Sequence, residues 1–381
     1  MTIENDSQVK RFLEKIEDEC FDHLLEMSPA LVKWYQKNKR PLPWRVLWKK
    51  SKDPYHIWVS EVMLQQTVIS VVIPKYHEFL KEFPSIHELA SGSEAEVKKA
   101  VRGLGYYRRF SFLHQGAKQL VARSEGSKSP VWPKDFKSWK ELPGVGDYTA
   151  AAVSSIAFNE AEAVVDGNVE RVFCRLFDIR LPPNLPALKR GFKKLGNFCI
   201  DRKYPGDFNQ GIMELGQLVC TPSEPSCDIC PVNTWCLARK NNSTEVSPSA
   251  KIKKESVNLD MNLIIFRKQG KIGLLKRPNS AKFLKDTEGF LTLVKRGKSY
   301  IPDGGKSPYQ EYAKLKSLGF VSHSITNHRL KVKVSCGEPH QVPQGRQIEW
   351  LNSPQVEERL IANLDRKAWN LFLKKGKELF N

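Results

Sequence analysis

The stretch ELPGVGDYTAAAVSS, residues 141–155, places a proline and two glycines just before an alanine-rich helix. A glycine-rich turn that enters a helix exposes backbone N–H groups at the positive end of the helix dipole, so an anion can approach closely. The preceding DFKSWKEL predicts a short helix, and no Gly-Lys-Ser/Thr follows the second glycine, which excludes a nucleotide P-loop. The unit is a helix, a hairpin and a helix. Unless it is a structural corner without a ligand, we expect it to hold the phosphates of one nucleic-acid strand through Leu142, Gly144, Val145 and Gly146.

The length and the net charge of the chain agree with a nucleic-acid partner. The chain has 381 residues, enough for two or three domains, and Lys and Arg outnumber Asp and Glu by 61 to 42, which gives a net charge of +19. An anionic membrane is the rival partner for such a basic chain. However, no apolar stretch approaches the roughly 20 residues that span a bilayer, and MTIENDSQVKRFLEKIEDEC has neither a basic nor an apolar leader region. We expect a cytoplasmic, nucleoid-associated protein that does not bind membranes.

The pattern of apolar residues changes along the chain. LVKWYQK, EVKKAVRGL, TAAAVSSIAF and VERVFCRLF repeat apolar residues at helical spacing, and residues 1–237 are predicted to form a mainly α domain. Residues 238–258 are rich in Ser, Asn and Lys, which predicts a linker. LDMNLIIF, KIGLL and RLKVKVSC then carry strand patterns, and DRKAWNLFLKKGKELF predicts a helix. Residues 259–381 are therefore expected to form a smaller α+β domain.

Four of the eight cysteines crowd into CTPSEPSCDICPVNTWC, residues 220–236. Cys220, Cys227, Cys230 and Cys236 have the spacing C-x6-C-x2-C-x5-C, and the prolines among them favour a compact, non-helical loop. Four thiolates on one loop suit either tetrahedral zinc or a [4Fe-4S] cluster, although zinc sites usually come as two C-x2-C pairs and only one is present. The spacing predicts a metal centre and leaves the metal open.

Two carboxylates stand out. Glu61 is the one acid in the apolar helix predicted for PYHIWVSEVMLQQT, where burial favours a protonated carboxyl and equips it as a general acid near neutral pH. It can equally be a buried acid with its hydrogen bonds satisfied. Asp166 in VVDGNVERVF directly precedes a predicted helix, so its simplest role is that of an N-cap.

Six motifs in order resemble the helix-hairpin-helix DNA glycosylase superfamily, and most closely the adenine DNA glycosylases of the MutY type. They are LPW (42–44), SEVMLQQT (60–67), GLGYY (103–107), LPGVGDYTA (142–150), VDGNV (165–169) and the four-cysteine loop. The resemblance covers roughly the first 237 residues. It implies a [4Fe-4S] cluster on Cys220, Cys227, Cys230 and Cys236, and a helix-hairpin-helix glycosylase core.

The resemblance also implies roles for four residues. In the sister endonuclease III group the position that matches Tyr148 is a lysine, whose amine attacks the sugar and makes the enzyme a lyase. A phenol forms no such Schiff base, so Tyr148 indicates a glycosylase that leaves an abasic site. Glu61 would protonate the departing adenine at N7 and assist water, while Asp166, with Asn168 beside it, would stabilise the oxocarbenium-like sugar or trap it covalently.

Chemistry on a base requires that the base leave the stack, so the enzyme must fill the gap. By family likeness, Gln66 and Tyr106 intrude beside the partner base; the alternative is that they are ordinary helix-surface and core residues. Arg108 and Arg109 follow directly and are candidates for phosphate contacts, or else for a solvated face.

The C-terminal part resembles, more weakly, the Nudix-like domain that adenine glycosylases use to check for 8-oxoguanine. No Nudix catalytic box with its R-E-x-x-E-E glutamates is present, so hydrolysis of nucleoside diphosphates is not expected. The family's F-S-H recognition loop corresponds here to Ile325, Thr326 and Asn327, which keep a hydroxyl and a polar group and lose the aromatic wedge. These residues are either the lesion-reading loop or a strand-entry loop.

Three hypotheses follow. The first is a monomeric adenine DNA glycosylase acting on double-stranded DNA that contains adenine opposite 8-oxoguanine or guanine. The second is a glycosylase-lyase for pyrimidine lesions, against which Tyr148 and the long C-terminal domain argue. The third is a non-catalytic iron-sulfur DNA-binding protein, against which the pair Glu61 and Asp166 argues.

Overall fold

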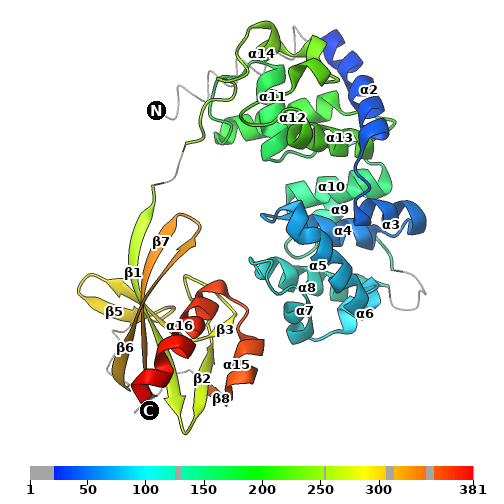
Figure 1. Ribbon diagram of the computed structural model, residues 1–381. Coiled ribbons are helices and arrows are strands. Elements are labelled where there is room, and N and C mark those ends of the chain that lie inside the picture. Colours follow the sequence, from blue (N-terminus) through cyan, green and yellow to red (C-terminus); the bar gives the residue numbers. More distant parts are fainter. Residues whose placement is uncertain (1–20, 125–129, 253–254, 306–312, 340–346, 381) are drawn as a thin grey trace. The chain divides into compact units, whose positions relative to one another are not determined.

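The computed structural model describes residues 21–124, 130–252, 255–305, 313–339 and 347–380 (Figure 1). The chain forms two compact units, one up to Ile252 and one from Lys253. The division between them falls inside the predicted linker 238–258. The segment 1–20, on which the expectation of a chain without a leader depends, lies outside the described residues.

The first unit consists of helices joined by short loops. Its elements in chain order are α2 (Phe21–Asn38), α3 (Pro43–Ser51), α4 (Pro54–Leu64), α5 (Ile69–Glu82), α6 (Ile86–Ser91), α7 (Glu94–Ala100), α8 (Arg108–Arg123), α9 (Phe136–Lys140), α10 (Asp147–Phe158), α11 (Gly167–Leu176), α12 (Pro186–Cys199), α13 (Pro205–Leu218), the 3-10 turns η1 (Cys227–Ile229) and η2 (Asn233–Trp235), and α14 (Leu237–Lys240). Three of the four helices expected from the apolar pattern are confirmed in α2, α10 and α11. The fourth, EVKKAVRGL at 96–104, is helical only as far as Ala100, where α7 ends and a turn follows.

The helix α10, which carries the opening stretch, separates two hydrophobic cores. Ala151 and Ala152 are buried among α2, α11, α12 and α13, whereas Ala150 and Val153 are buried among α3 to α9. Figure 1 shows α10 between these two groups of helices. Small side chains on every face of α10 let helices approach closely from both sides, which explains why this stretch is rich in alanine.

The predicted linker packs on the first unit as far as Ile252. Ser247 Oγ donates to Cys174 O at 2.8 Å, and Ile252 N donates to Asn184 Oδ1 at 3.0 Å. Side-chain hydrogen bonds to backbone atoms order this polar segment without an apolar core of its own.

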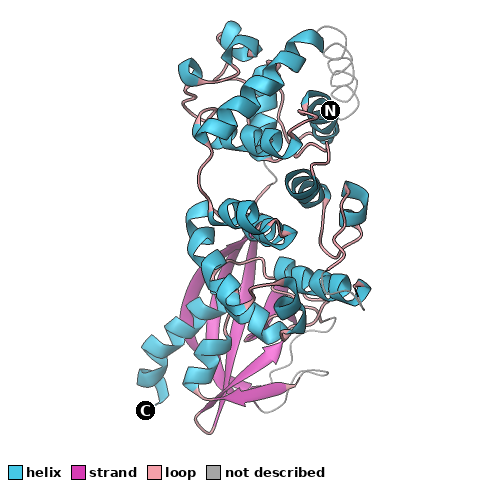
Figure 2. Ribbon diagram, turned by 90° about the vertical axis from the view of Figure 1, so that its right-hand side faces the viewer, coloured by secondary structure: helices cyan, strands magenta, loops and turns pink. Residues whose placement is uncertain are grey.

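The second unit is built on one sheet. Its elements are β1 (Val257–Lys268), β2 (Lys271–Lys276), β3 (Glu288–Gly289), β4 (Leu291–Arg296), β5 (Ser299–Pro302), β6 (Ala313–Ile325), β7 (His328–Pro339), β8 (Ile348–Leu351), α15 (Ser353–Arg359) and α16 (Asn363–Phe380). The sheet is mixed, because β7 pairs parallel with β1 while β6 with β7, and β2 and β4 with β1, pair antiparallel. Figure 2 shows the strands confined to this unit, among the described residues.

The strand β1 is buried on both faces of this sheet. Leu263 and Ile265 face the core that α15 and α16 cover, and Ile264 and Phe266 face a second, smaller core. The predicted alternation in RLKVKVSC is confirmed, since Leu330, Val332, Val334 and Cys336 are buried and the lysines between them are exposed.

The fold class expected from the sequence is confirmed: a mainly α core with a helix-hairpin-helix unit, and a smaller α+β domain. In the described parts of the chain, none of the helices combines the length and the apolar character needed to cross a bilayer.

Candidate active site

Six helices of the first unit line one cavity of about 520 Å³, here called the catalytic cavity. It is lined from α3, α4, α5, α10, α11 and α13 and brings together the four residues expected to act in catalysis: Glu61, Tyr148, Asp166 and Asn168. These residues are up to 107 positions apart in the chain (168 − 61). Only the packing of α4 and α11 around α10 and α13 makes them neighbours.

Glu61 lies in the middle of α4 and is only 5 % exposed. The helix starts as the sequence predicts, with Asp53 as the N-cap accepting from Tyr55 N at 3.0 Å and Pro54 in the first turn. Burial raises the pKa of Glu61 to about 7, although the neighbouring Tyr148 hydroxyl and the Arg45 guanidinium lower it. Its Oε2 atom is buried without a hydrogen-bond partner in the described part of the protein. A carboxyl of this kind can hold a proton near neutral pH and give it to a group inside the cavity.

Tyr148 lies in the first turn of α10, between the two carboxylates. Its hydroxyl donates to Met213 Sδ at 3.2 Å. Burial, and then the charges of Glu61 and Asp166, raise the pKa of Tyr148 well above 10. The phenol therefore stays neutral and serves as a hydrogen-bond donor in this cavity.

Asp166 is the N-cap of α11, as the sequence suggested for its simplest role. Its Oδ1 accepts from Asn168 N at 2.9 Å and from Val169 N at 2.8 Å, and its Oδ2 accepts from Asn168 Nδ2 at 2.9 Å. The cap fixes the carboxylate at the edge of the catalytic cavity, where it also lies. Asp166 can therefore cap α11 and also act in the catalytic cavity.

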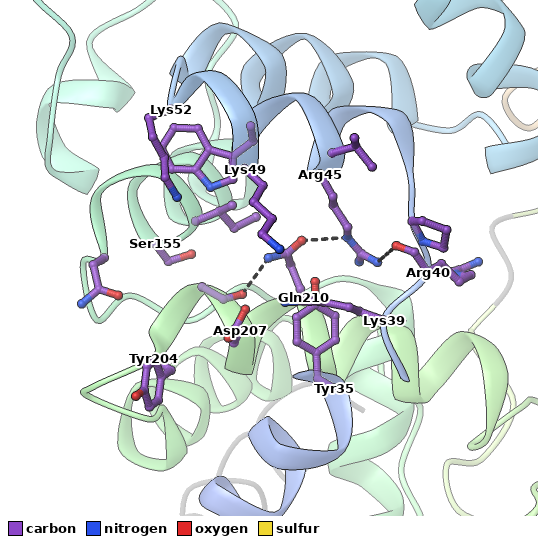
Figure 3. A pocket seen from close by; sticks show the side chains of 16 residues that line it. Tyr35, Lys39, Arg40, Arg45, Lys49, Lys52, Ser155, Tyr204, Asp207 and Gln210 are labelled. Atoms are coloured by element: carbon purple, nitrogen blue, oxygen red, sulfur yellow. Dashed lines mark hydrogen bonds between the residues drawn. The ribbon is translucent and has the colours of Figure 1, made fainter. Parts of the chain in front are cut away.

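Glu214 and Arg45 also line the catalytic cavity, and the sequence interpretation did not include them. The Glu214 side chain is 1 % exposed and pairs with Arg45 Nη1 at 2.5 Å and with Arg40 Nε at 2.7 Å. Arg45 Nε in turn donates to Gln210 Oε1 at 2.9 Å, a contact visible in Figure 3. The signal that singled out Glu61, one acid in an apolar helix, is weaker at Glu214, because α13 also carries Asp207, Asn209 and Gln210.

The predicted hairpin connects α9 to α10. Leu142 and Val145 are buried and anchor it, and Val145 N donates to Leu142 O at 3.2 Å. Gly144 has a φ of +71°, and a side chain there would lie 2.5 Å from Phe112 Cβ, so both conformation and space require glycine. A Cβ at Gly146 would meet open space, which leaves the first turn of α10 accessible to a ligand.

Gln66 and Tyr106 lie on two loops whose backbones are strained. Gln66 is exposed with a φ of +58°, and Tyr106 is 53 % exposed with a φ of +48°. Residues other than glycine adopt this region at a cost, which is commonly met where a side chain has a functional position. Gln66 directly precedes Thr67, which lines the catalytic cavity.

Arg109 is not available for phosphate, and the expectation of a phosphate contact there is wrong. The side chain is buried, and its Nη1 donates to the carbonyls of Val62, Met63 and Gln65 at the end of α4. Its Nη2 donates to Thr67 Oγ1 at 2.9 Å and to Leu104 O at 3.1 Å. One guanidinium therefore joins the loop of Gln66 to the loop of Tyr106. This cation is attracted by the carbonyl oxygens at the end of a helix. The sequence around Arg109 cannot show which distant helix end supplies them.

Arg109→Lys is expected to lower the free energy of unfolding by about 3 kcal/mol, because an ammonium group cannot reach acceptors on both loops and leaves buried carbonyls unpaired. Denaturant unfolding measures the effect. The matched control is Arg108→Lys on the exposed neighbour, which should change stability by less than about 0.5 kcal/mol. Equal effects of the two substitutions would show that the Arg109 guanidinium does not join the two loops.

The four cysteines of the loop line a second, smaller cavity together with Arg175 and Asn233. Arg175 Nη1 donates to Cys220 Sγ at 3.3 Å and to Thr221 O at 2.6 Å, which places a positive charge beside sulfur. All four thiols are free of disulfides. In the residues that the structure describes, no three His, Cys, Asp or Glu side chains converge closely enough to bind a single metal ion.

The helix α11 connects the cysteine loop to the catalytic cavity. Arg171 Nη2 donates to Asn168 Oδ1 at 3.0 Å and to Gly216 O at 2.6 Å, and its Nε donates to Cys220 O at 2.9 Å. The loop and the N-terminus of α11 are thus held by the same side chain. A Cβ on Gly216 would lie 2.7 Å from Asn168 Cβ, so α13 needs glycine where it passes the site.

Thr326 and Asn327 belong to the second unit, where they form the tight turn between β6 and β7. Thr326 is exposed with a φ of +55°, which is unusual for a β-branched residue. Asn327 Nδ2 donates to Glu255 O at 3.1 Å and ties the turn to the start of β1. The segment is a strand-entry turn in shape, with the Thr326 side chain at its tip.

Comparisons with known proteins agree with this geometry. Residues 59–195 match the family described as HhH-GPD superfamily base excision DNA repair protein. The adenine DNA glycosylase of Homo sapiens is 43 % identical over 216 residues, which cover 55 % of this chain and 39 % of that protein. The adenine DNA glycosylase of Buchnera aphidicola subsp. Schizaphis graminum is 32 % identical over 262 residues, 68 % of this chain and 71 % of that protein.

Among solved structures, a thermostable thymine-DNA glycosylase is 26 % identical, with a TM-score of 0.48, over 56 % of this chain and 94 % of that chain. The chain spans less than half of the length of the plant and mammalian relatives that it matches. The extended match to the Buchnera protein and the match to the superfamily identify the chain as a member of the adenine DNA glycosylase family.

Proposed function

We propose that the protein is a monofunctional DNA N-glycosylase that hydrolyses the glycosidic bond of adenine mispaired with 8-oxoguanine or guanine. The observation that carries this proposal is the catalytic cavity itself, in which a buried carboxyl with a pKa near 7, a second carboxylate, a phenol and an amide meet. Departure of a purine needs a proton donor on the base side and negative charge on the sugar side, and the cavity offers both.

Glu61 is the proton donor in this proposal. A desolvated carboxyl whose pKa burial raises to about 7 can carry a proton near neutral pH and is suited to protonate adenine N7 as the bond breaks. Its Oε2 has no hydrogen-bond partner within the described protein, so it can bond to the base. The Tyr148 hydroxyl, on the neighbouring helix α10, interacts with the same carboxyl group. After the base departs, the ionised Glu61 can accept a proton from the attacking water.

Asp166 stabilises the positive charge that develops on the sugar. The cap holds this carboxylate through three donors from α11, so it is preorganised and does not need to reorient during the reaction. Asn168 takes part because its Nδ2 donates to Asp166 Oδ2. Arg171 Nη2 donates to Asn168 Oδ1 and so fixes the orientation of the side-chain amide.

Base removal without strand cleavage follows from the chemistry of the lining. A lyase needs an amine nucleophile, and no lysine is present among the described residues that line the catalytic cavity. Tyr148, at the position where the lyase group has lysine, has no amine. This observation disfavours the glycosylase-lyase alternative.

Glu214 and Arg45 are proposed to orient the base. They present a carboxylate acceptor and guanidinium donors to the same cavity, which complements the amino group and ring nitrogens of adenine. A site that pairs its buried polar groups with those of the base rejects bases that lack them.

Binding of the duplex is proposed to use the hairpin and the two strained loops. The open first turn of α10, with Gly144 and Gly146, suits a phosphate, and the exposed Gln66 and Tyr106 are available to fill the space that the extruded adenine leaves. Arg109 fixes both loops without contacting DNA.

Cys220, Cys227, Cys230 and Cys236 are proposed to hold a [4Fe-4S] cluster, which would order the loop. The proposal rests on the family resemblance and on four thiols that are free of disulfides and line one cavity. Arg175 beside Cys220 suits an anionic group there.

The second unit is proposed to read the partner base. Thr326 offers an exposed hydroxyl at the tip of the β6–β7 turn, and Asn327 offers its amide from the same turn. Polar contacts of this kind can favour 8-oxoguanine over guanine by roughly ten- to a hundredfold.

The dependence of the excision rate on pH tests the proposal. Because the protonated form of Glu61 acts, the single-turnover rate should be highest below about pH 7 and fall as the pH rises through that value. The assay uses duplex with adenine opposite 8-oxoguanine at saturating enzyme, with duplex affinity measured at each pH as the control. A rate that rises through pH 7 would contradict the role of Glu61 as an acid.

A further inference from the structure

A second large cavity shares part of its wall with the catalytic cavity, and its remaining lining residues have no part in the chemistry above. It measures about 450 Å³ and is bounded by the end of α2, by α3, by the last turn of α10 and by the first turns of α13 (Figure 3). We call it the α3–α13 cavity. Its volume is within the range of small-molecule sites.

Its lining is strongly basic. Lys39, Lys49 and Lys52 are exposed around it, and Arg40 and Arg45 add two guanidinium groups. The one carboxylate among the described lining residues is Asp207, which already accepts from Gln36 Nε2 at 2.9 Å. Arg40 and Arg45 both pair with Glu214, so the three lysines carry most of the positive charge that the cavity offers to a ligand. A lining with more cations than anions selects an anionic ligand.

Its lining is also aromatic. Tyr204 is 41 % exposed, and Trp48 is partly exposed with Lys52 Nζ 5.3 Å from its ring centroid. Each ring has a cation over one face, since Lys203 Nζ lies 5.1 Å from the Tyr204 ring centroid. A planar group can stack on the face that remains. A phosphate joined to a flat, heteroaromatic ring meets both requirements.

The cavity lies away from the surface proposed to hold DNA. The hairpin precedes Asp147 at the start of α10, whereas Ser155 and Asn159 at the other end of that helix line the α3–α13 cavity. A helix of 12 residues is about 18 Å long. A phosphate held at the hairpin is therefore about one helix length from the Ser155 and Asn159 side of this cavity.

We propose that the α3–α13 cavity binds a free nucleoside phosphate, with the phosphate on the lysines of α3 and the base against Trp48 and Tyr204. Arg40, Arg45 and Gln210 line this cavity and the catalytic cavity alike, so an occupant touches the wall that the two share. The hydrogen bonds that build this wall run from Gly206 O through Gln210 to Arg45.

Calorimetric titration of the full chain with guanosine 5′-monophosphate tests the proposal; its base is not the one that the enzyme is proposed to excise. One molecule should bind, more tightly than orthophosphate or guanosine alone. The double variant Lys49→Ala/Lys52→Ala should weaken binding about tenfold or more, and Tyr204→Ala roughly tenfold. None of these residues lines the catalytic cavity.

Lys50→Ala, on the exposed neighbour of Lys49 that does not line the cavity, is the matched control and should leave the affinity unchanged. Binding should also persist when fully paired duplex DNA saturates the protein. No binding at millimolar nucleotide, equal losses in Lys50→Ala, orthophosphate that binds as tightly as the nucleotide, or displacement by the duplex would each overturn the proposal.

Discussion

Glu61→Gln is expected to lower the single-turnover rate of adenine excision by roughly 10²- to 10⁴-fold, the usual contribution of a positioned general acid. The amide keeps the shape of the buried side chain and has no proton of suitable acidity to give. Affinity for the duplex should be unchanged, because Glu61 lies inside the cavity and carries no phosphate contact. Rates from denaturing gels after alkali, together with affinities from fluorescence anisotropy, separate the two effects.

Glu78→Gln is the matched control for this experiment. Glu78 lies on α5 in the same unit, its side chain is 58 % exposed, and it pairs with Lys75 at the surface. This variant should excise adenine at the rate of the unchanged protein. If Glu61→Gln did so too, Glu61 would be a buried acid of no catalytic consequence.

Asp166→Asn is expected to reduce excision by roughly 10²- to 10³-fold while the fold persists, because it removes the negative charge that faces the developing cation. Asparagine caps helices about as well as aspartate, so the free energy of unfolding should change by less than about 1 kcal/mol. Excision rate and denaturant unfolding are measured on the same preparation.

A second capping aspartate provides the comparison. Asp135 caps α9 by accepting from Ser138 N at 2.9 Å and does not line the catalytic cavity. Asp135→Asn should have a similarly small effect on stability and none on excision. Equal rates for the two variants would reduce Asp166 to a helix cap.

The sequence could predict the residues whose local setting is unusual. Glu61 stands out as an acid in an apolar helix, and Asp166 stands out as a cap before an amphipathic one, because both signals lie within a few residues along the chain. Their meeting in one cavity depends on how α4, α10, α11 and α13 pack. Only the family resemblance, and no local pattern, connected them beforehand.

The residues that sequence reasoning missed or misplaced owe their positions to distant partners. Arg109 looks like a surface cation at the start of α8, yet backbone carbonyls from α4, over 40 residues away, bury it. Arg45 pairs with Glu214 across 169 positions. The polar segment after α14 becomes ordered because its backbone and hydroxyl groups bond to α11. Such pairings join residues that are far apart in the sequence, and they therefore produce no periodic pattern in it.

The central claim is that the catalytic cavity removes adenine by hydrolysis and does not cut the strand. Its most direct test incubates excess protein with duplex DNA containing adenine opposite 8-oxoguanine and measures free adenine, strand breaks before and after hot alkali, and covalent adducts with borohydride. Adenine should be released, strand breaks should appear only after alkali, and no adduct should form. Breaks before alkali with a trapped protein–DNA adduct, or an intact glycosidic bond throughout, would contradict it.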